Sequence, residues 1–169
     1  MRLRNLIPSR AKLELYKSSA ILAHFTYCHT VWDFCKASDK RQLEWVQERA
    51  LRAIFNSKSD SYKELLLKAK HPNLYNRRLQ DIMILMYKVK KSPDYVNIIF
   101  EVTDQRNSLR NVDFDRPRYN TVHYGEHSLR YFGPYLWSQL TQEERDKPSL
   151  ESFTKCASQK NLENLLENN

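Results

Sequence analysis

Glycine is nearly missing from this chain: its 169 residues include only Gly125 and Gly133, which lie eight positions apart. A dinucleotide-binding loop and a phosphate-binding P-loop each need glycines at fixed, closer spacing, so both motifs are excluded. Tight hairpin turns also depend on glycine for positive φ angles, which makes an all-β fold unfavourable. The sequence therefore predicts a mostly α fold without a glycine-rich nucleotide-binding loop.

Long apolar segments are missing as well. No apolar run approaches the roughly 20 residues that span a bilayer. Met1-Arg2-Leu3-Arg4 leads into charged residues instead of the apolar stretch of a signal peptide. The three cysteines are an odd number, which disfavours the disulfide framework of a secreted protein. We therefore expect an intracellular protein, nuclear or cytoplasmic, that is neither secreted nor bound to a membrane.

Positive charge is plentiful but unevenly placed. The chain holds 28 Lys+Arg and 20 Asp+Glu, a net charge of +8. Residues 1–100 contain 19 basic and 9 acidic side chains, residues 101–140 contain five of each, and residues 141–169 contain four and six. A basic region of this kind favours a polyanionic partner, with affinity from counterion release by phosphates. The alternative is a solvated surface that happens to be rich in lysine.

The first hundred residues show the apolar spacing of amphipathic helices. Ser9 is a predicted N-cap, followed by one helix of about 25 residues without glycine or proline. A second helix is predicted to begin at Asp39. Its apolar stripe is expected to consist of Leu43, Val46, Ala50 and Ile54. Its solvent face is expected to consist of Lys40, Glu44, Glu48 and Arg52, with ion pairs four residues apart.

Two further helices are predicted before residue 92. Ser61 and Glu64 have the spacing of a capping box, which marks the start of a short helix. Pro72 is expected to stop that helix, because the residue before a proline is disfavoured in helical conformation. The next helix is predicted from about Leu74 to Lys91.

The amino-acid composition and the apolar spacing change after about residue 100. The chain is therefore predicted to have three regions. Residues 1–100 form a helical bundle, residues 101–124 an irregular polar connector, and residues 125–169 a small aromatic-rich helical unit. In the last region, Gly133-Pro134 is expected to interrupt an aromatic cluster. Thr141 and Ser149 are predicted to start helices.

Two groups of side chains have the composition of metal sites, but neither has the full pattern. A cysteine–histidine group consists of His24, Cys28, His29 and Cys35; it lacks the paired short spacings of a zinc site and the orienting residue of a Cys–His nucleophile. Packed thiols and imidazoles are the favoured interpretation. Asp113 and Asp115 could meet a Mg²⁺ ion, but such residues in a polar connector more often form turns. No metal or cofactor site is predicted.

Two arginine-containing segments are candidates for binding anions. Arg77 and Arg78 fall in the first turn of a predicted helix, where their charge opposes the helix dipole. An anion is therefore expected near them, either a carboxylate of this chain or a nucleic-acid phosphate. Arg116 and Arg118 alternate with aromatic residues, a composition that single-stranded nucleic-acid grooves use. The alternative for that segment is a small aromatic core.

Several strings, spread over nearly the whole chain, occur in the same order and spacing in one known family. They are Val46-Gln47-Glu48-Arg49-Ala50-Leu51-Arg52, Asn76-Arg77-Arg78-Leu79, His127-Ser128-Leu129-Arg130-Tyr131 and Gly133-Pro134 with Leu136-Trp137. The chain resembles the C-terminal region, thumb and post-thumb, of a LINE-type (non-long-terminal-repeat) retrotransposon reverse transcriptase of the jockey or chicken-repeat type.

The resemblance implies a role in holding nucleic acid. The family's thumb is a helical bundle that grips the template–primer duplex from its backbone side. For this chain it implies phosphate contacts without sequence preference and an RNA or DNA template–primer as partner, together with the upstream polymerase domain. The candidate contacts are Arg49, Arg52, Arg77, Arg78, Arg116 and Arg118.

The family's chemistry is not expected from this chain alone. Reverse transcription needs paired aspartates that hold two Mg²⁺ ions, and the sequence contains no Asp-Asp. Mg²⁺ would belong to the missing catalytic palm, so the chain is expected to be a non-enzymatic fragment of a transposable element. Ala23 and Thr141 also depart from the family pattern, which indicates a decayed copy. The alternative function is a helical protein-interaction module or an inert remnant that associates with itself.

Overall fold

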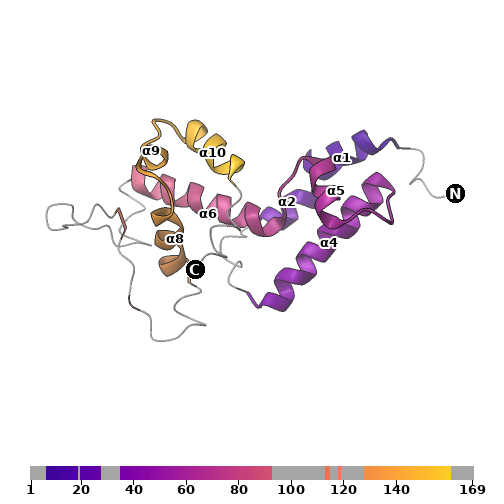
Figure 1. Cartoon of the computed structure of the whole chain (residues 1–169), viewed down its shortest axis with the longest axis horizontal. Coiled ribbons are helices and arrows are strands. Elements are labelled where there is room, and N and C mark those ends of the chain that lie inside the picture. Colours follow the sequence, from indigo (N-terminus) through magenta and orange to yellow (C-terminus); the bar gives the residue numbers. More distant parts are fainter. Residues whose placement is uncertain are drawn as a thin grey trace. The chain divides into compact units, whose positions relative to one another are not determined.

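The computed structural model describes residues 7–18, 20–27, 35–92, 113–114, 118 and 128–160. These residues are mostly α-helical, which confirms the predicted fold class (Figure 1). The helices are α1 (Ser9–Ser18), α2 (Ala20–Thr26), α4 (Ala37–Phe55), α5 (Tyr62–Ala69), α6 (Leu74–Lys91), α8 (Leu129–Ser138), α9 (Gln142–Arg145) and α10 (Leu150–Gln159).

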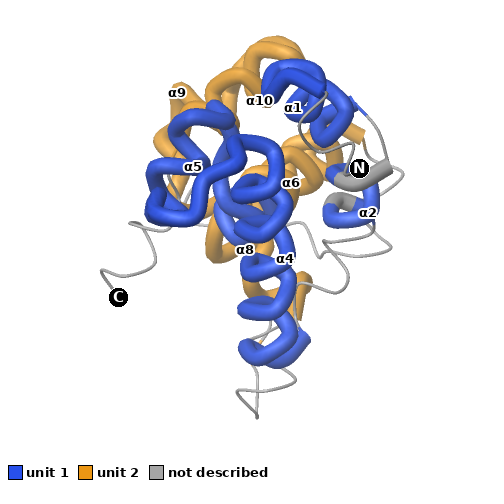
Figure 2. Tube along the Cα trace, turned by 90° about the vertical axis from the view of Figure 1, so that its right-hand side faces the viewer, with its two compact units in different colours: residues 1–78 blue, residues 79–169 orange. Residues whose placement is uncertain are grey.

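The chain divides into two compact units, residues 1–78 (unit 1) and residues 79–169 (unit 2), which Figure 2 distinguishes by colour. The division falls within α6, so the start of this helix belongs to unit 1 and the rest to unit 2. The predicted region boundaries near residues 100 and 124 lie outside the described residues.

Unit 1 has an apolar core between α1, α4 and α5. Its buried members are Tyr16, Leu51, Ile54, Leu65 and Ala69. Those from α4 lie in the C-terminal half of that helix. Half-buried side chains from α1, α2, α4 and α5 pack around them. Each fully buried large side chain contributes about 1.5–3 kcal/mol relative to an exposed one, so this cluster is the main source of stability in unit 1.

The buried side of α4 differs from the predicted one. Val46 is 44% exposed, whereas Gln47, Leu51 and Ile54 are buried. The stripe is rotated because Gln47 can enter the core: its amide Nε2 donates to the Tyr16 hydroxyl at 3.1 Å. A buried amide is tolerated when it is hydrogen-bonded in this way.

The helix starts in unit 1 agree only in part with the predictions. The capping box of α5 is present: the Ser61 hydroxyl accepts from the Glu64 N–H at 3.3 Å, and the Glu64 carboxylate accepts from the Ser61 N–H at 2.7 Å. However, α4 begins at Ala37, two residues before the predicted Asp39. Asp39 instead lies in the first turn, where its carboxylate favours the positive end of the helix dipole.

The described part of the long helix predicted after Ser9 consists of α1 and α2, and Ser19 between them lies outside the described residues. At the end of α1, the Ser18 hydroxyl donates to the Glu14 carbonyl at 2.7 Å. A serine that bonds back to the carbonyl four residues earlier often bends a helix. The continuity of the helix through Ser19 therefore stays a prediction.

Two helices of unit 1 end without glycine. Asn56 follows α4 with φ 52°, and Lys70 follows α5 with φ 50°. Both lie in the left-handed region that most often ends a helix at glycine. α5 thus ends at Ala69, and its cap residue Lys70 lies two positions before the predicted stop at Pro72. In a glycine-poor chain, other residues take up this conformation at a cost of about 1–2 kcal/mol each.

Unit 2 is built around four aromatic side chains from separate segments. Tyr87 of α6 stacks on Phe153 of α10, with ring centroids 4.5 Å apart. Trp137 of α8 lies 5.8 Å from Phe153 and 5.8 Å from Phe114, which meets it edge to face. All four are at most 3% exposed. The predicted aromatic cluster therefore contributes Trp137 to the core, but its partners come from other parts of the chain.

Gly133-Pro134 lies inside α8 and does not interrupt it. A proline in a helix usually clashes with the Cβ atom of the preceding residue, and glycine has no Cβ. The pair is buried, so its small and rigid surface packs within unit 2. The pair thus lies between the aromatic residues of α8 without ending the helix.

The last two helices begin as predicted. The capping box of Thr141 and Glu144 opens α9, and the Ser149 side chain accepts from the Ser152 N–H at the start of α10. Burial alone would raise the pKa of Glu144, but hydrogen bonds from Lys160 and from the Thr141 backbone lower it overall. The Glu144 carboxylate therefore joins α9 to the end of α10.

Among the described residues, no helix combines the length and the apolar character needed to cross a membrane.

Candidate nucleic-acid interface

The solvent side of α4 is basic and aromatic. Beyond the first turn, its exposed residues are Arg41, Gln42, Trp45, Val46, Arg49 and Ala53, which we call the α4 face. These positions recur at spacings of three and four and therefore lie on one side of the helix. None of these six residues is acidic; the exposed acid described in α4 is Asp39, in the first turn.

The two glutamates of α4 form contacts away from the α4 face. The charged residues of the α4 face are therefore both arginines. Glu48 is half-buried and forms an ion pair with Arg52 at 2.7 Å. Glu44 is half-buried and turns toward the start of α6. The predicted ion pair four residues apart is therefore present between Glu48 and Arg52. The predicted solvent face itself was wrong, because its four residues are half-buried and the exposed side of α4 is the α4 face.

Glu44 caps the N-terminus of α6. Its carboxylate accepts from the backbone N–H groups of Leu74, at 3.3 Å, and Tyr75, at 2.7 Å. Asn73 accepts from the Asn76 N–H at 2.8 Å through its side chain. The first three N–H groups of α6 thus have acceptors, and a negative charge lies at the positive end of the helix. This carboxylate is an internal anion at the helix end that carries Arg77 and Arg78.

The same carboxylate belongs to a polar network within unit 1. The Tyr62 hydroxyl lies 2.5 Å from Glu44 Oε2 and 2.6 Å from Gln47 Oε1. Burial, followed by the hydrogen bond to Glu44, raises the pKa of Tyr62 well above its ordinary value. Tyr62 therefore remains a neutral donor. Because Gln47 also donates to Tyr16, the network joins α1, α4, α5 and the start of α6.

Trp45 is the most unusual side chain of the α4 face. It is 54% exposed, although tryptophan is highly buried on average. The Arg49 guanidinium lies over its ring, with Cζ 4.5 Å from the ring centroid. This is a cation–π contact between residues four apart on the helix. Trp45 and Arg41 were not among the predicted contacts. The spacing of four from Arg41 to Trp45, and again from Trp45 to Arg49, was the signal that could have found them.

The structure places the four predicted arginines of unit 1 differently. Arg49 is exposed on the α4 face. Arg52 is half-buried and engaged, because it binds Glu48 twice and also donates to the Lys58 carbonyl at 3.1 Å. Arg77 is half-buried in the first turn of α6. The four therefore do not form one continuous surface.

Arg78 requires a correction. It is only 2% exposed, and its Cζ lies 5.8 Å from the Tyr75 ring centroid. A buried guanidinium cannot reach a phosphate backbone at the surface, so Arg78 is removed from the candidate contacts. Its burial favours the internal interpretation of the arginine pair.

The remaining candidates lie in the predicted connector. Arg116 lies outside the described residues, as does Asp115. Arg118 is exposed. The connector candidates therefore stay predictions, and the interface is built from unit 1.

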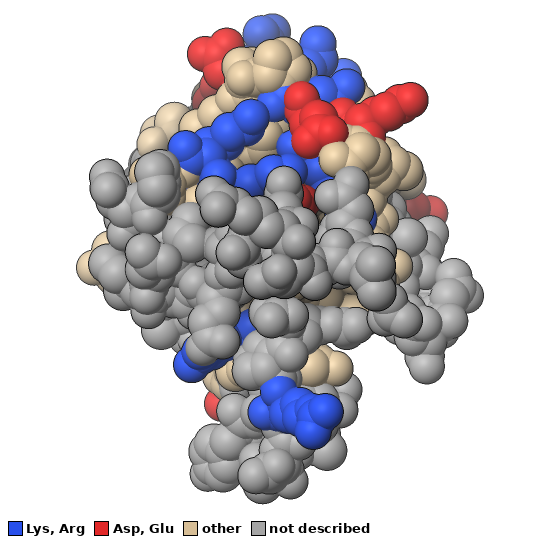
Figure 3. Space-filling view, turned by 90° about the vertical axis from the view of Figure 1, so that its left-hand side faces the viewer, with Lys and Arg blue, Asp and Glu red and all other residues tan. Residues whose placement is uncertain are grey.

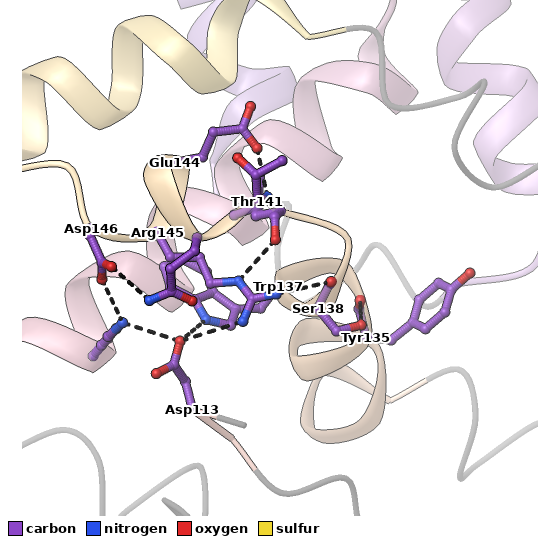
Figure 4. A network of polar contacts seen from close by, with 11 residues as sticks. Asp113, Tyr135, Trp137, Ser138, Thr141, Glu144, Arg145 and Asp146 are labelled. Atoms are coloured by element: carbon purple, nitrogen blue, oxygen red, sulfur yellow. Dashed lines mark hydrogen bonds and ion pairs between the residues drawn. The ribbon is translucent and has the colours of Figure 1, made fainter. Parts of the chain in front are cut away.

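Asp113, considered above as a metal ligand, is occupied by contacts within unit 2 (Figure 4). Its carboxylate accepts from the Trp137 indole N–H at 2.7 Å and from Lys90 at 3.1 Å, and lies 4.0 Å from Arg145. Arg145 also donates to the carbonyls of Leu140 and Ser138. These contacts hold the residue before Phe114 against α8, which is a structural role.

Net charge separates the two units. Unit 1 contains 16 Lys+Arg and 7 Asp+Glu, a net charge of +9, and unit 2 contains 12 and 13, a net charge of −1. Figure 3 shows a face on which basic side chains lie beside acidic ones. In unit 2, such pairs include Lys90 with Asp113 and Asp146. The whole positive excess of the chain therefore belongs to unit 1.

The cysteine–histidine group is only partly visible. Cys28 and His29 lie outside the described residues, while Cys35 is half-buried. Within the part of the chain that the structure describes, no group of three or more His, Cys, Asp or Glu side chains could hold a metal ion. The zinc alternative thus stays open.

Comparison of the chain with protein-family models, with curated proteins and with solved structures gave no significant match. The resemblance to LINE-type reverse transcriptases therefore rests on the sequence strings quoted above.

Proposed function

We propose that this chain binds the phosphate backbone of nucleic acid without sequence preference, as the thumb-like C-terminal part of a LINE-type reverse transcriptase. The observation that carries the proposal is the α4 face, with its two exposed arginines and no acid among its six residues. The +9 charge of unit 1 supports it, because a net positive charge attracts a polyanion from solution.

The spacing of the two arginines suits a strand of phosphates. Arg41 and Arg49 are eight residues apart, or about 12 Å along the helix axis. One strand of duplex carries a phosphate about every 3.4 Å of axis, so this distance covers three to four nucleotide steps. Two such contacts position a backbone but cannot read its sequence, since sequence is read from base edges.

The proposal assigns no catalytic step to this chain. The resemblance places the Asp-Asp motif and its Mg²⁺ ions in an upstream palm domain, which would work on the template–primer that this chain holds. Unit 1 would contribute affinity for the template–primer and would hold it in place.

Fluorescence anisotropy with a labelled template–primer duplex tests the proposal. Between 50 and 200 mM salt, the logarithm of the affinity should fall linearly with the logarithm of the salt concentration. The double variant Arg41→Gln/Arg49→Gln should bind more weakly and lower the slope by about two, since each lost phosphate contact removes about 0.9. Circular dichroism should show unchanged helicity.

A matched double variant in unit 2 controls for total charge. Lys88→Gln/Lys155→Gln removes two exposed cations from the nearly neutral unit and should leave the slope close to that of the parent chain. The proposal is wrong if the parent chain shows no binding or binding that ignores salt; the helical interaction module would then be the better hypothesis. An equal effect of the two double variants would also refute the assignment to α4.

A further inference from the structure

We infer that Trp45 is a stacking platform for an unpaired nucleobase, flanked by the phosphate-binding side chains Arg41 and Arg49. This inference rests on the proposed function and adds a ligand class to it: single-stranded or frayed nucleic acid. It would allow unit 1 to distinguish a free strand or an open primer end from the interior of a duplex.

The first observation behind the inference is that Trp45 is exposed. More than half of its surface is open to solvent, and leaving a large aromatic side chain exposed forgoes about 1.5–3 kcal/mol of burial. The core of unit 1 lies on another side of α4, where Leu51 and Ile54 are buried. Trp45 therefore does not stabilise the core of unit 1, and its aromatic surface is available to a ligand.

The contact with Arg49 carries the second step. A guanidinium 4.5 Å from the ring centroid favours one orientation of the tryptophan before any ligand arrives. Restricting a side chain in advance lowers the entropy lost on binding. The guanidinium covers one side of the ring, and the exposed remainder can receive a base. Arginine planes also stack on bases, so both members of the pair suit the same ligand.

Charge decides which kind of partner this surface fits. Trp45 lies between two arginines, each four residues away, and no acid occurs among the six residues of the α4 face. A protein partner would need a matching acidic and apolar patch, whereas every nucleotide provides a phosphate beside an aromatic base. Alternation of cations and aromatics is the arrangement that single-strand-binding grooves use. The field of the +9 unit favours the same polyanion.

Stacking also explains why unpaired bases are preferred. Bases inside a duplex are already stacked on their neighbours and cannot reach Trp45. In a single strand, each base presents an aromatic face, and one base–aromatic stack contributes about a factor of five or more to affinity. The backbone contacts of Arg41 and Arg49 are available in both cases.

The experiment compares three labelled ligands on the full chain: an oligothymidine, an abasic strand of equal length and charge, and a blunt duplex. The parent chain should bind oligothymidine at least about fivefold more tightly than the abasic strand. Trp45→Ala should remove that difference and leave binding to the abasic strand and the duplex within about twofold. Trp45→Phe should retain most of it, because a smaller aromatic ring still stacks.

Tyr27→Ala is the matched control, since Tyr27 is another exposed aromatic residue of unit 1, at 76% exposure. It should leave the preference for oligothymidine unchanged. Equal binding of oligothymidine and the abasic strand by the parent chain, with salt dependence retained, overturns the stacking inference and leaves the proposed function standing. Loss of the preference in Tyr27→Ala overturns the assignment to Trp45. Absence of salt-dependent binding to all three ligands overturns both proposals.

Discussion

The Glu44 carboxylate accepts a hydrogen bond from the backbone N–H of Tyr75, with Oε1 2.7 Å from the amide nitrogen, although 31 positions separate the two residues. A side chain in the middle of α4 thus completes the first turn of α6. The adjacent positions Arg77 and Arg78 bring positive charge to a helix end that already disfavours it. Glu44 places a negative charge at the same helix end from within the protein, so a bound phosphate is not needed to explain the arginine pair.

Replacement of Glu44 should therefore destabilise the protein. Glu44→Ala removes the acceptor for two α6 N–H groups and for Tyr62. We expect the free energy of unfolding to fall by about 2 kcal/mol, as for the loss of a charged helix cap. Glu44→Gln keeps an acceptor oxygen and should lose less. Urea denaturation followed by circular dichroism measures both.

The control is Glu14→Ala, which removes an exposed glutamate from α1 of the same unit. Surface substitutions of this kind usually change stability by less than about 0.5 kcal/mol. A Glu44→Ala variant as stable as Glu14→Ala would show that the cap contributes nothing.

Asp113 and Trp137 should be energetically coupled through the hydrogen bond that joins them. The Asp113 side chain is 8% exposed and accepts from the indole at 2.7 Å. In a double-mutant cycle of Asp113→Ala and Trp137→Phe, we expect a coupling of about 1.5 kcal/mol, the lower range for a hydrogen bond to a charged group. Urea denaturation of the four proteins measures it.

Asp146 provides the comparison for that cycle. It also pairs with Lys90, at 3.5 Å, but its side chain is 55% exposed. Because solvent screens an exposed pair, Asp146→Ala should leave the midpoint of unfolding unchanged. Additive effects of Asp113→Ala and Trp137→Phe would contradict the coupling.

His71 should make stability fall as the pH drops below about 6.5, the ordinary pKa of histidine. Burial lowers its pKa, the hydrogen bond to the Pro72 carbonyl partly opposes this, and Arg77 and Lys17 lower it further. The folded protein therefore favours the neutral ring, whereas an unfolded chain protonates histidine near pH 6.5. Stability should be complete above that value and should fall as the pH drops through it toward the lower pKa of the folded state.

The measurement is the free energy of unfolding at several pH values, for the parent chain and for His71→Gln. The variant should show a flatter profile in this window. The carboxyl group of Glu144, whose pKa is lowered by its hydrogen bonds, acts at lower pH: its contribution is present above about pH 4 and is lost below it. Identical slopes for the two proteins would exclude His71 as the cause.

Local signals in the sequence predicted much of the fold. The capping box of Ser61 and the N-cap Ser149 act within three residues, so they could be recognised without the fold. The range Leu74–Lys91 followed from apolar spacing alone. What spacing could not show was which side of α4 becomes buried, because Gln47 enters the core only through Tyr16, 31 positions away.

The candidate site was less predictable than the fold. Arginines could be listed from the sequence, but their accessibility depends on partners in other helices, which is why Arg78 and Arg49 lie at opposite extremes of exposure. The helical position of Glu44 predicted a surface residue. It caps α6 because that helix begins beside it. Trp45 reads as a core residue from its chemistry, and only the structure shows it exposed.

The polar network of unit 1 also determines the order in which a newly made chain can fold on the ribosome. Tyr16 meets its amide partner only after Gln47 has emerged, and Glu44 receives its backbone donors only after Tyr75 has emerged. In each pair the two residues are 31 positions apart, so neither hydrogen bond can form until the chain between them has been synthesised. A nascent chain that stops between α5 and α6 would therefore present Glu44 without its backbone partners, and unit 1 reaches its final form only when the first turn of α6 is complete.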